Sequence, residues 1–197
     1  SDSPRFIAGL SMGGFAALRL AGQYPTVYKA ASAHSALTDM SQIDALIEES
    51  RAHWSSEPSS TSVLAALKAR LAARYGVPAD WLTLGNGSND ILELVARAYL
   101  APGLNAVFSE HAFAVYPIVT QAVGAQAKVI PANNWGHDLP AMLQAIDEQT
   151  RVVFIANPIN PTGTWFSAEA LDEFLQDVPA HVLVVLDEAY IEYAEGS

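Results

Sequence analysis

Two short segments near the end of the chain bring together side chains that could bind a charged aromatic molecule. The first is the turn Asn-Pro-Ile-Asn-Pro-Thr-Gly at residues 157–163, which follows an apolar run at residues 152–156. The second is an apolar run at residues 182–186 that leads into Asp187, with Tyr190 three residues later. Ligands of open α/β sheets bind at the carboxyl ends of strands. An amide, a carboxylate and a phenol at that edge suit an aromatic cofactor with a basic ring nitrogen and a ring hydroxyl.

A glycine-containing turn at residues 84–90, Leu-Gly-Asn-Gly-Ser-Asn-Asp, provides a second candidate binding element. It lies between a strand-like and a helix-like segment, so backbone N–H groups are free at the start of the helix. Such groups bind phosphate, and glycines allow the anion to approach closely. The same pattern also fits an ordinary helix entry. Its interpretation as an anion site therefore depends on the rest of the chain.

A third candidate is the segment Gly-Leu-Ser-Met-Gly at residues 9–13, which carries Ser11 between a predicted strand and a predicted helix. This is the context of a nucleophile elbow, in which a sharp turn exposes the serine at the helix N-terminus. A serine hydrolase also needs an acid, a histidine and an upstream oxyanion-hole loop. Only ten residues precede Ser11, and the pair His137-Asp138 is better explained by Asp138 as a helix cap. A glycine-rich turn with an incidental serine is the alternative.

The spacing of apolar residues predicts strands and helices that alternate along the chain. Alternation of this kind predicts an α/β fold, a three-layer α/β/α arrangement around a mostly parallel sheet. The serine-rich segment at residues 51–62 is the only linker-like stretch, and it divides residues 1–55 from residues 56–197. The two segments could also form one continuous α/β body. We expect strands at residues 6–8, 28–33, 81–84, 106–108, 128–130, 152–156 and 182–186, and helices at residues 12–23, 41–50, 63–75, 88–100, 116–123, 138–148 and 167–176.

The composition of the 197-residue chain excludes several classes of function. A net charge of −11 argues against nucleic acid and anionic membrane surfaces, which leaves a small-molecule ligand as the expected partner. No apolar run approaches the length of a membrane span, and the first residues lack the layout of a signal peptide. Cysteine is absent, so disulfides and thiolate metal sites are excluded. We therefore expect a cytoplasmic protein, and we predict no metal site.

The beginning of the chain resembles the esterases of the α/β-hydrolase family. The resemblance rests on residues 6–21, Phe-Ile-Ala-Gly-Leu-Ser-Met-Gly-Gly-Phe-Ala-Ala-Leu-Arg-Leu-Ala, and extends to about residue 50. It implies that Ser11 is the catalytic nucleophile of a carboxylesterase. It also implies that the chain is a fusion, joined near residues 51–62, because the remaining residues resemble a different family.

From about residue 62 onward the chain is similar to the large domain of histidinol-phosphate aminotransferases, which are fold-type I enzymes dependent on pyridoxal 5′-phosphate (PLP). Four motifs follow in the family's order, at residues 85–94, 109–117, 157–163 and 185–193. The resemblance implies that backbone amides of Ser88 and Asn89 hold the cofactor phosphate. It also implies that Phe113 stacks on the pyridine ring, that Asn160 and Tyr190 bind the ring hydroxyl, and that Asp187 pairs with the ring nitrogen. Each residue also has a structural alternative: Asp187 as a turn cap, Phe113 as core, Asn160 as a turn former.

The lysine that forms a Schiff base with PLP in this family comes a few tens of residues after the motif at residues 185–193. The lysines of this chain are Lys29, Lys68 and Lys128, and none occupies that position. We therefore expect a truncated aminotransferase-like protein that binds PLP weakly and without a covalent bond. Fold-type I enzymes are usually dimers, so the resemblance also implies a homo-oligomer. A carboxylesterase that uses Ser11 and a non-catalytic, chimeric folded or oligomeric module remain alternatives.

Overall fold

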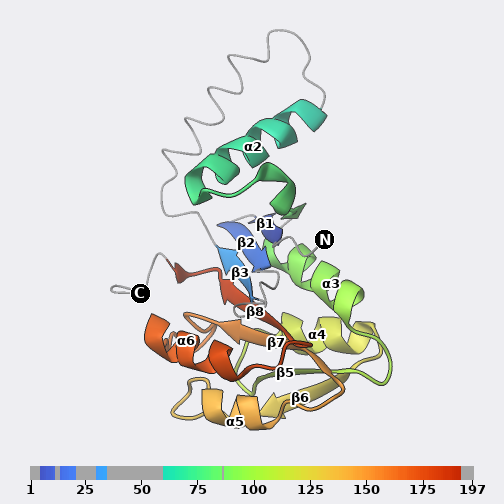
Figure 1. Cartoon of the computed structure of the whole chain (residues 1–197), viewed down its shortest axis with the longest axis vertical. Coiled ribbons are helices and arrows are strands. Elements are labelled where there is room, and N and C mark those ends of the chain that lie inside the picture. Colours follow the sequence, from blue (N-terminus) through green and yellow to red (C-terminus); the bar gives the residue numbers. More distant parts are fainter. Residues whose placement is uncertain (1–4, 12–13, 21–29, 35–59, 86, 192–197) are drawn as a thin grey trace.

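The structure, a computed structural model, describes residues 5–11, 14–20, 30–34, 60–85 and 87–191 (Figure 1). Its main feature is a five-stranded sheet in which every pair of neighbours is parallel. Strands of a parallel sheet that are buried on both faces have continuous apolar sequences. The runs at residues 152–156 and 182–186 have this pattern. The strands, in spatial order, are β3 (Ala30–His34), β8 (Leu183–Glu188), β7 (Thr150–Ala156), β5 (Asn105–Ser109) and β6 (Gln126–Ile130).

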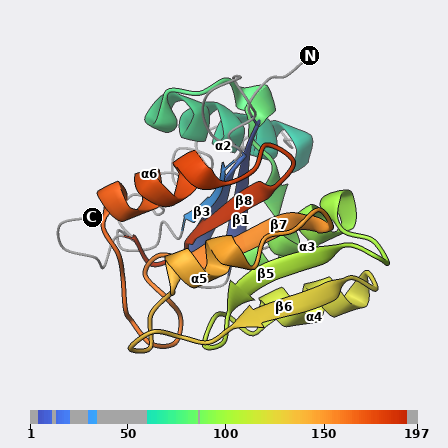
Figure 2. The same cartoon turned by 60° about the horizontal axis from the view of Figure 1, so that its bottom comes forward.

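Helices cover both faces of this sheet, which confirms the predicted three-layer α/β/α fold. Two helices lie on one face and two on the other (Figure 2). Successive side chains of a strand point to opposite faces, so Val152 and Phe154 face one helix pair and Val153 faces the other. The helices on the first face are α3 (Gly87–Tyr99) and α4 (Val115–Ala122), and those on the second are α5 (Leu139–Gln144) and α6 (Ala168–Asp177).

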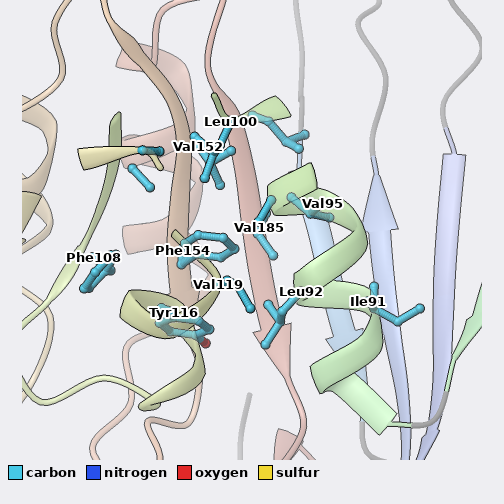
Figure 3. Close-up of a cluster of buried hydrophobic side chains, with 14 of the residues drawn as sticks. Ile91, Leu92, Val95, Leu100, Phe108, Tyr116, Val119, Val152, Phe154 and Val185 are labelled. Carbon is cyan, nitrogen blue, oxygen red and sulfur yellow. The ribbon is translucent and has the colours of Figure 1, made fainter. Parts of the chain in front are cut away.

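The larger core cluster lies between the sheet and the pair α3 and α4 (Figure 3). Ile91, Leu92 and Val95 come from one face of α3, at the spacing of successive helical turns. Tyr116, Phe108 and Phe154 are the largest fully buried side chains of this cluster, and Tyr116 and Phe154 are 0% exposed. The cluster fixes α4 against the sheet, and therefore fixes the loop that precedes α4.

Side-chain caps set the starts of two helices as the sequence predicted. Asp138 accepts a hydrogen bond from Ala141 N at 3.0 Å and begins α5, and Ser167 accepts one from Ala170 N at 3.3 Å and begins α6. Helix α5 is shorter than predicted, because it ends at Gln144 rather than near residue 148. The chain turns there: Asp147 bonds to Thr150 and leads directly into β7.

A smaller three-stranded sheet lies beside the main one. It contains β1 (Arg5–Ser11), β2 (Gly14–Leu20) and β4 (Leu84–Gly85), in the order β2-β1-β4. Strands β1 and β2 are antiparallel, and β1 and β4 are parallel. In each sheet a strand from the first 55 residues pairs with one from the rest of the chain: β1 with β4, and β3 with β8.

The helix predicted over residues 12–23 is wrong where the structure describes it, because residues 14–20 form strand β2. The run Gly-Phe-Ala-Ala-Leu-Arg-Leu is short enough to satisfy either a helix or a strand, and the periodicity of a short apolar run does not distinguish them. Pairing with a neighbouring strand then decides the outcome. The helix predicted over residues 41–50 lies outside the described residues.

The remaining elements precede the main sheet. Helix α2 (Ser60–Tyr75) ends at Gly76, as predicted, with a φ of 65° and a hydrogen bond from Val77 N to Ala72 O. The strand predicted at residues 81–84 is largely replaced by the 3-10 turn η1 (Ala79–Trp81), and β4 begins only at Leu84. In the parts of the chain that the structure describes, no helix is long and apolar enough to cross a membrane.

Candidate functional site

A small pocket lies at the carboxyl ends of β7 and β8. Its position follows from the strand order: β5 is followed in sequence by β6 on one side, whereas β7 and β8 lie on the other. A crevice forms where the strand order reverses in this way, and ligands of open α/β sheets bind there. Asn89 is absent from the lining, but every other residue predicted to contact the cofactor is present. The lining residues are Ser88, Phe113, Ala156, Pro158, Asn160, Asp187, Ala189 and Tyr190.

Asp187 lies in the wall of this pocket, next to the end of β7. Strand pairing places it opposite Ala156, and Asn157 N donates a hydrogen bond to the Asp187 carbonyl oxygen at 3.0 Å. The side chain is 4% exposed. Its Oδ2 accepts a hydrogen bond from Tyr116 Oη at 2.9 Å, and its Oδ1 accepts one from Ala189 N at 3.2 Å. The carboxylate is therefore held in place by two neutral donors.

The charge of Asp187 lacks a countercharge in the described part of the chain, where no cation forms a salt bridge with it. Burial raises the pKa of this carboxyl to about 6, although the hydrogen bonds from Tyr116 and Ala189 lower it. A buried carboxylate is costly unless it is paired. A ligand that brings a positive charge to this wall would remove that cost, and a protonated ring nitrogen fits this requirement.

The turn at residues 157–163 is braced from within. Asn157 donates from Nδ2 to Phe166 O at 2.9 Å and accepts from Phe166 N at 3.1 Å, which closes the loop around residues 158–165. Gly163 has a φ of 73°, which favours glycine, and its N–H donates to Ile159 O at 2.8 Å. The loop thereby presents Asn160 to the pocket. Asn160 Nδ2 lies 3.5 Å from Tyr190 Oη, so the two predicted partners of a ring hydroxyl face each other across a long contact.

The predicted phosphate site lies at the start of α3. Ser88 is half-buried and lines the pocket, whereas Asn89 is exposed beside it in the first turn. First-turn N–H groups have no partner within their helix, so they can bind an anion. A Cβ added at Gly85 would lie 2.8 Å from Asp90 Cβ and 2.9 Å from Ile91 Cδ1, so only glycine fits as the chain enters the helix. Gly87 has a φ of 84°.

Aromatic rings form the other side of the pocket. Phe113 follows β5, is half-buried and lines the pocket. Its ring meets the ring of Tyr116 edge to face, with centroids 6.0 Å apart and an interplanar angle of 89°. Tyr116 in turn stacks on Phe154 at 4.9 Å and 8°. The position of Phe113 suits a ring that stacks on a planar ligand.

Two residues near the pocket were not predicted as site residues. The sequence places Tyr116 in the motif at residues 109–117 and at the start of a helix but gives it no role, although its spacing of three from Phe113 would place both on one side of the helix start. His137 Nε2 lies 2.9 Å from Ala156 O and 3.2 Å from Ala156 N, while its buried Nδ1 has no partner. Burial lowers the pKa of His137 to about 4. No sequence pattern signals this contact, because it joins a loop to a distant strand.

Other candidate residues lie elsewhere. Lys128 on β6 donates to Ala145 O at 2.9 Å and pairs with Asp147, and Lys68 lies on α2. Lys29 falls outside the described residues. Neither described lysine lines the pocket. Ser11 is the last residue of β1 and pairs with Gly14 of β2, so the strand-to-helix turn that a nucleophile elbow requires is absent at this position.

The chain is similar in sequence to histidinol-phosphate aminotransferases. Over 132 residues it is 87% identical to histidinol-phosphate aminotransferase 2 of Pseudomonas fluorescens, a stretch that covers 67% of this chain and 36% of that protein. Over 130 residues it is 76% identical to histidinol-phosphate aminotransferase 2 of Pseudomonas aeruginosa, which covers 66% of this chain and 35% of that protein. The chain therefore spans little more than a third of the length of these curated relatives.

Solved structures agree with the sequence matches. The crystal structure of histidinol-phosphate aminotransferase from Sinorhizobium meliloti, in complex with pyridoxal-5′-phosphate, has a TM-score of 0.61 and 29% identity. The match covers 66% of this chain and 36% of that one. A structure from Erwinia carotovora atroseptica has a TM-score of 0.65 and covers 77% of this chain and 44% of that one; at 21% identity it supports the fold alone.

The family model also decides how far the relationship extends. The model for aminotransferase class I and II matches residues 19–197. This match begins before the junction predicted at residues 51–62, so it gives no support to a fusion there. Together with the α/β/α fold and the pocket at the strand ends, it assigns the family: the chain belongs to the class I and II aminotransferases.

Proposed function

We propose that residues 60–191 form the PLP-binding half-site of a histidinol-phosphate aminotransferase. The observation that carries this proposal is Asp187, a buried carboxylate without a cationic partner among the described residues, in the wall of a pocket at the strand ends. The pyridine nitrogen of PLP, when protonated, is the cation that this carboxylate lacks. The sequence matches and the PLP complex of the Sinorhizobium meliloti protein support the same cofactor.

Each pocket residue has a role toward this cofactor. Backbone N–H groups of Ser88 and Asn89 bind the phosphate at the start of α3, and Phe113 stacks on the pyridine ring. Asn160 and Tyr190 donate to the ring hydroxyl, and Asp187 holds the proton on the ring nitrogen. PLP, when bound, supplies an electron sink for carbanion chemistry at the substrate. A charge-assisted bond of the Asp187 type contributes about 1.5–3 kcal/mol.

We expect the 197-residue chain to bind PLP weakly, because neither of the lysines that the structure describes, Lys68 and Lys128, lines the pocket. Ordering and association costs of several kcal/mol oppose the contacts above, so the expected Kd is roughly micromolar to millimolar. Lys128 is engaged by Asp147 and Ala145 at another part of the sheet. Borohydride reduction after PLP addition should therefore give at most scattered labelling of Lys29, Lys68, Lys128 or the N-terminal amine.

The test is titration of the purified chain with PLP, followed by absorbance and by thermal unfolding. Asp187→Ala should weaken binding, whereas Asp172→Ala, which removes an exposed carboxylate from α6, should not. Equal affinity of both variants and the wild type would contradict the assignment of Asp187. A stoichiometric reduced adduct at one lysine would contradict the expected non-covalent mode.

The substrate proposal comes from the relatives rather than from the pocket. Proteins called histidinol-phosphate aminotransferases match the chain at 87% and 76% identity, and we infer the same substrate class for the full catalytic unit. We expect no complete transamination by the 197 residues alone. Turnover of an amino acid by the purified chain, measured as conversion of bound PLP to its amine form, would contradict this expectation.

The other predictions from the sequence remain to be tested in solution. The esterase alternative requires Ser11 to react with a fluorophosphonate, and we expect no labelling because Ser11 ends a strand. The division between residues 1–55 and 56–197 stays a prediction, which limited proteolysis would support by cutting near residue 55. A non-catalytic module would show neither PLP binding nor labelling.

Assembly and location complete the proposal. Exposed apolar side chains on the outer sides of α3 and α4, such as Leu94, Tyr99 and Ile118, favour self-association into a homo-oligomer. A monomer in light scattering at micromolar concentration would contradict this.

The cytoplasm is the expected location of a PLP-dependent biosynthetic enzyme with this composition.

A further inference from the structure

The hydrogen bond between Tyr116 and Asp187 brings a second residue into the chemistry of the pocket. Tyr116 Oη donates to Asp187 Oδ2 at 2.9 Å across 71 positions of sequence. Tyr116 is 0% exposed and is not among the residues that line the pocket. Its hydroxyl therefore reaches the carboxylate from behind the pocket wall, and any effect of this hydroxyl on a ligand passes through Asp187.

The ring of Tyr116 is fixed by its neighbours. One face stacks on Phe154 at 4.9 Å and 8°, and Phe113 meets the ring at 6.0 Å and 89° (Figure 3 shows the buried cluster that contains Tyr116 and Phe154). Thr120 Oγ1 donates to Tyr116 O at 2.7 Å and ties the backbone into α4. These contacts hold the ring in place, and its hydroxyl donates to Asp187.

The groups around Asp187 divide into those that favour its charge and those that oppose it. Tyr116 and Ala189 N donate hydrogen bonds that favour the carboxylate, and the nearby charge of Glu188 raises the pKa of Asp187. His137, which contacts Ala156 on the neighbouring strand, has its pKa lowered to about 4 and is neutral above that pH. Burial and the carboxylate raise the pKa of Tyr116 well above its ordinary value, so the phenol remains a donor.

We propose that Tyr116 is a positioning residue of this site, whose hydroxyl holds the Asp187 carboxylate ionised and oriented toward the pocket while its ring supports Phe113. The inference rests on the proposed function, because it assigns Tyr116 a role toward the same cofactor. One side chain thereby fixes two contacts of the bound ring: the charge beneath its nitrogen and the aromatic ring that stacks on it.

The first experiment compares the wild type with Tyr116→Phe, which removes only the hydroxyl. The probe is 4′-deoxypyridoxine 5′-phosphate, a cofactor analogue without the aldehyde, so reaction with lysines does not contribute. Calorimetric titrations from pH 5 to pH 9 should show about tenfold weaker binding by Tyr116→Phe at pH 7. The pH at which affinity rises should also move upward, because Asp187 loses a donor that favours its ionised form.

Ile155→Val is the matched control, because it removes one buried methyl group from the opposite face of β7 and leaves Tyr116 and its ring neighbours in place. It should lower thermal stability without moving the pH at which affinity rises. A purely structural role for Tyr116 would make the two variants behave alike. Superimposable pH profiles for Tyr116→Phe and the wild type would overturn the proposal.

A second measurement separates this inference from the proposed function. In the ligand-free chain, labelled with ¹³C at aspartate carboxyl carbons, the resonance missing in Asp187→Asn identifies Asp187. Its titration midpoint should lie at higher pH in Tyr116→Phe than in the wild type. If the wild type fails to bind the analogue, the proposed function fails, and this midpoint still tests Tyr116. An unchanged midpoint would overturn the role of Tyr116 even where the analogue binds.

Discussion

Two aspartates at opposite ends of the sheet have surroundings that differ in kind. Asp147 precedes β7, at the amino ends of the strands, and accepts hydrogen bonds from Lys128, Asn105 and the backbone of Gln149 and Thr150. The side chain of Asp187, at the carboxyl end of β8, accepts only from Tyr116 and Ala189 among the described residues. The first network contains a cation and the second does not.

A buried carboxylate needs a compensating charge more than an exposed one does, yet here, among the described residues, only the exposed carboxylate has one. The Lys128 hydrogen bond, together with Asn105 and Thr150, holds the pKa of exposed Asp147 well below its usual range. Burial raises the pKa of Asp187 to about 6. The charge of Asp147, which joins a loop to β7, is therefore compensated by Lys128. The charge of Asp187, which faces the pocket, is not compensated by any described residue. An uncompensated buried charge marks a binding site more specifically than an acidic residue at a strand end does.

Thr150→Val should break the compensated network with the largest effect. Thr150 is 0% exposed; its hydroxyl donates toward Asn105 Oδ1 at 2.8 Å or Asp147 Oδ1 at 2.9 Å, and accepts from Asp147 N at 2.9 Å. Valine keeps the shape but leaves the buried Asn105 Oδ1 without this donor and Asp147 N without this acceptor, so the free energy of unfolding should fall by about 2–3 kcal/mol. Urea denaturation measures it. Thr83→Val, at an exposed position, is the control, and an equal loss there would contradict the explanation.

Asp187→Asn should have the opposite sign and sharpen the comparison. A folded-state pKa above the ordinary value means that ionisation favours the unfolded chain, so this carboxylate costs stability as pH rises from about 4 through 6. Removing the charge should raise the free energy of unfolding of the ligand-free chain at pH 8. The net gain should be about 2 kcal/mol, because part of it is offset by a weaker hydrogen bond from Ala189 N. The gain should shrink by more than half at pH 4.5.

The same substitution should weaken PLP binding, since the ring nitrogen loses its countercharge. Asp147→Asn should instead lower stability at pH 8, because Lys128 loses its partner. If both substitutions lowered stability at pH 8, the contrast between the two ends of the sheet would be wrong.

His137→Gln extends the comparison to a base at the pocket edge and should have the smallest effect. The folded-state pKa of about 4 lies below the ordinary 6.5, so the stability contributed by neutral His137 is complete above pH 6.5 and is lost as pH falls toward 4. Between pH 7 and pH 4.5 the variant should therefore lose about 1–2 kcal/mol less than the wild type. Parallel stability curves over that range would show that His137 is not held neutral by the fold.

Much of the main sheet could be predicted from the sequence, because its signals are local. The runs that became β7 and β8 are too apolar for anything but a buried element, and Asp138 and Ser167 each cap a helix within three residues of themselves. The residues that line the pocket were found because each follows a strand or begins a helix. Strand ends converge at one edge in a parallel sheet, whatever the length of chain between them.

What could not be predicted depends on contacts between distant residues. Tyr116 meets Asp187 across 71 positions, and His137 meets Ala156 across 19. Neither pair has a spacing that a sequence pattern records. The helix prediction for residues 14–20 was wrong for a related reason. These seven residues fit a helix or a strand, and strand pairing with β1 decided between the two.

The residues that line the pocket are far apart in the sequence, and this separation has a consequence for how the protein folds. Ser88 and Tyr190 are far apart in the sequence although both line the pocket, and Asp187 lies on β8, the last described strand. Contacts of such high sequence separation form late, after the loops between them have closed. During synthesis Asp187, Ala189 and Tyr190 would be the last residues of the pocket to leave the ribosome. A cofactor that binds only the finished pocket stabilises the complete fold by mass action and leaves partly folded chains unaffected. Cofactor supply would then govern how much of the protein survives in the cell.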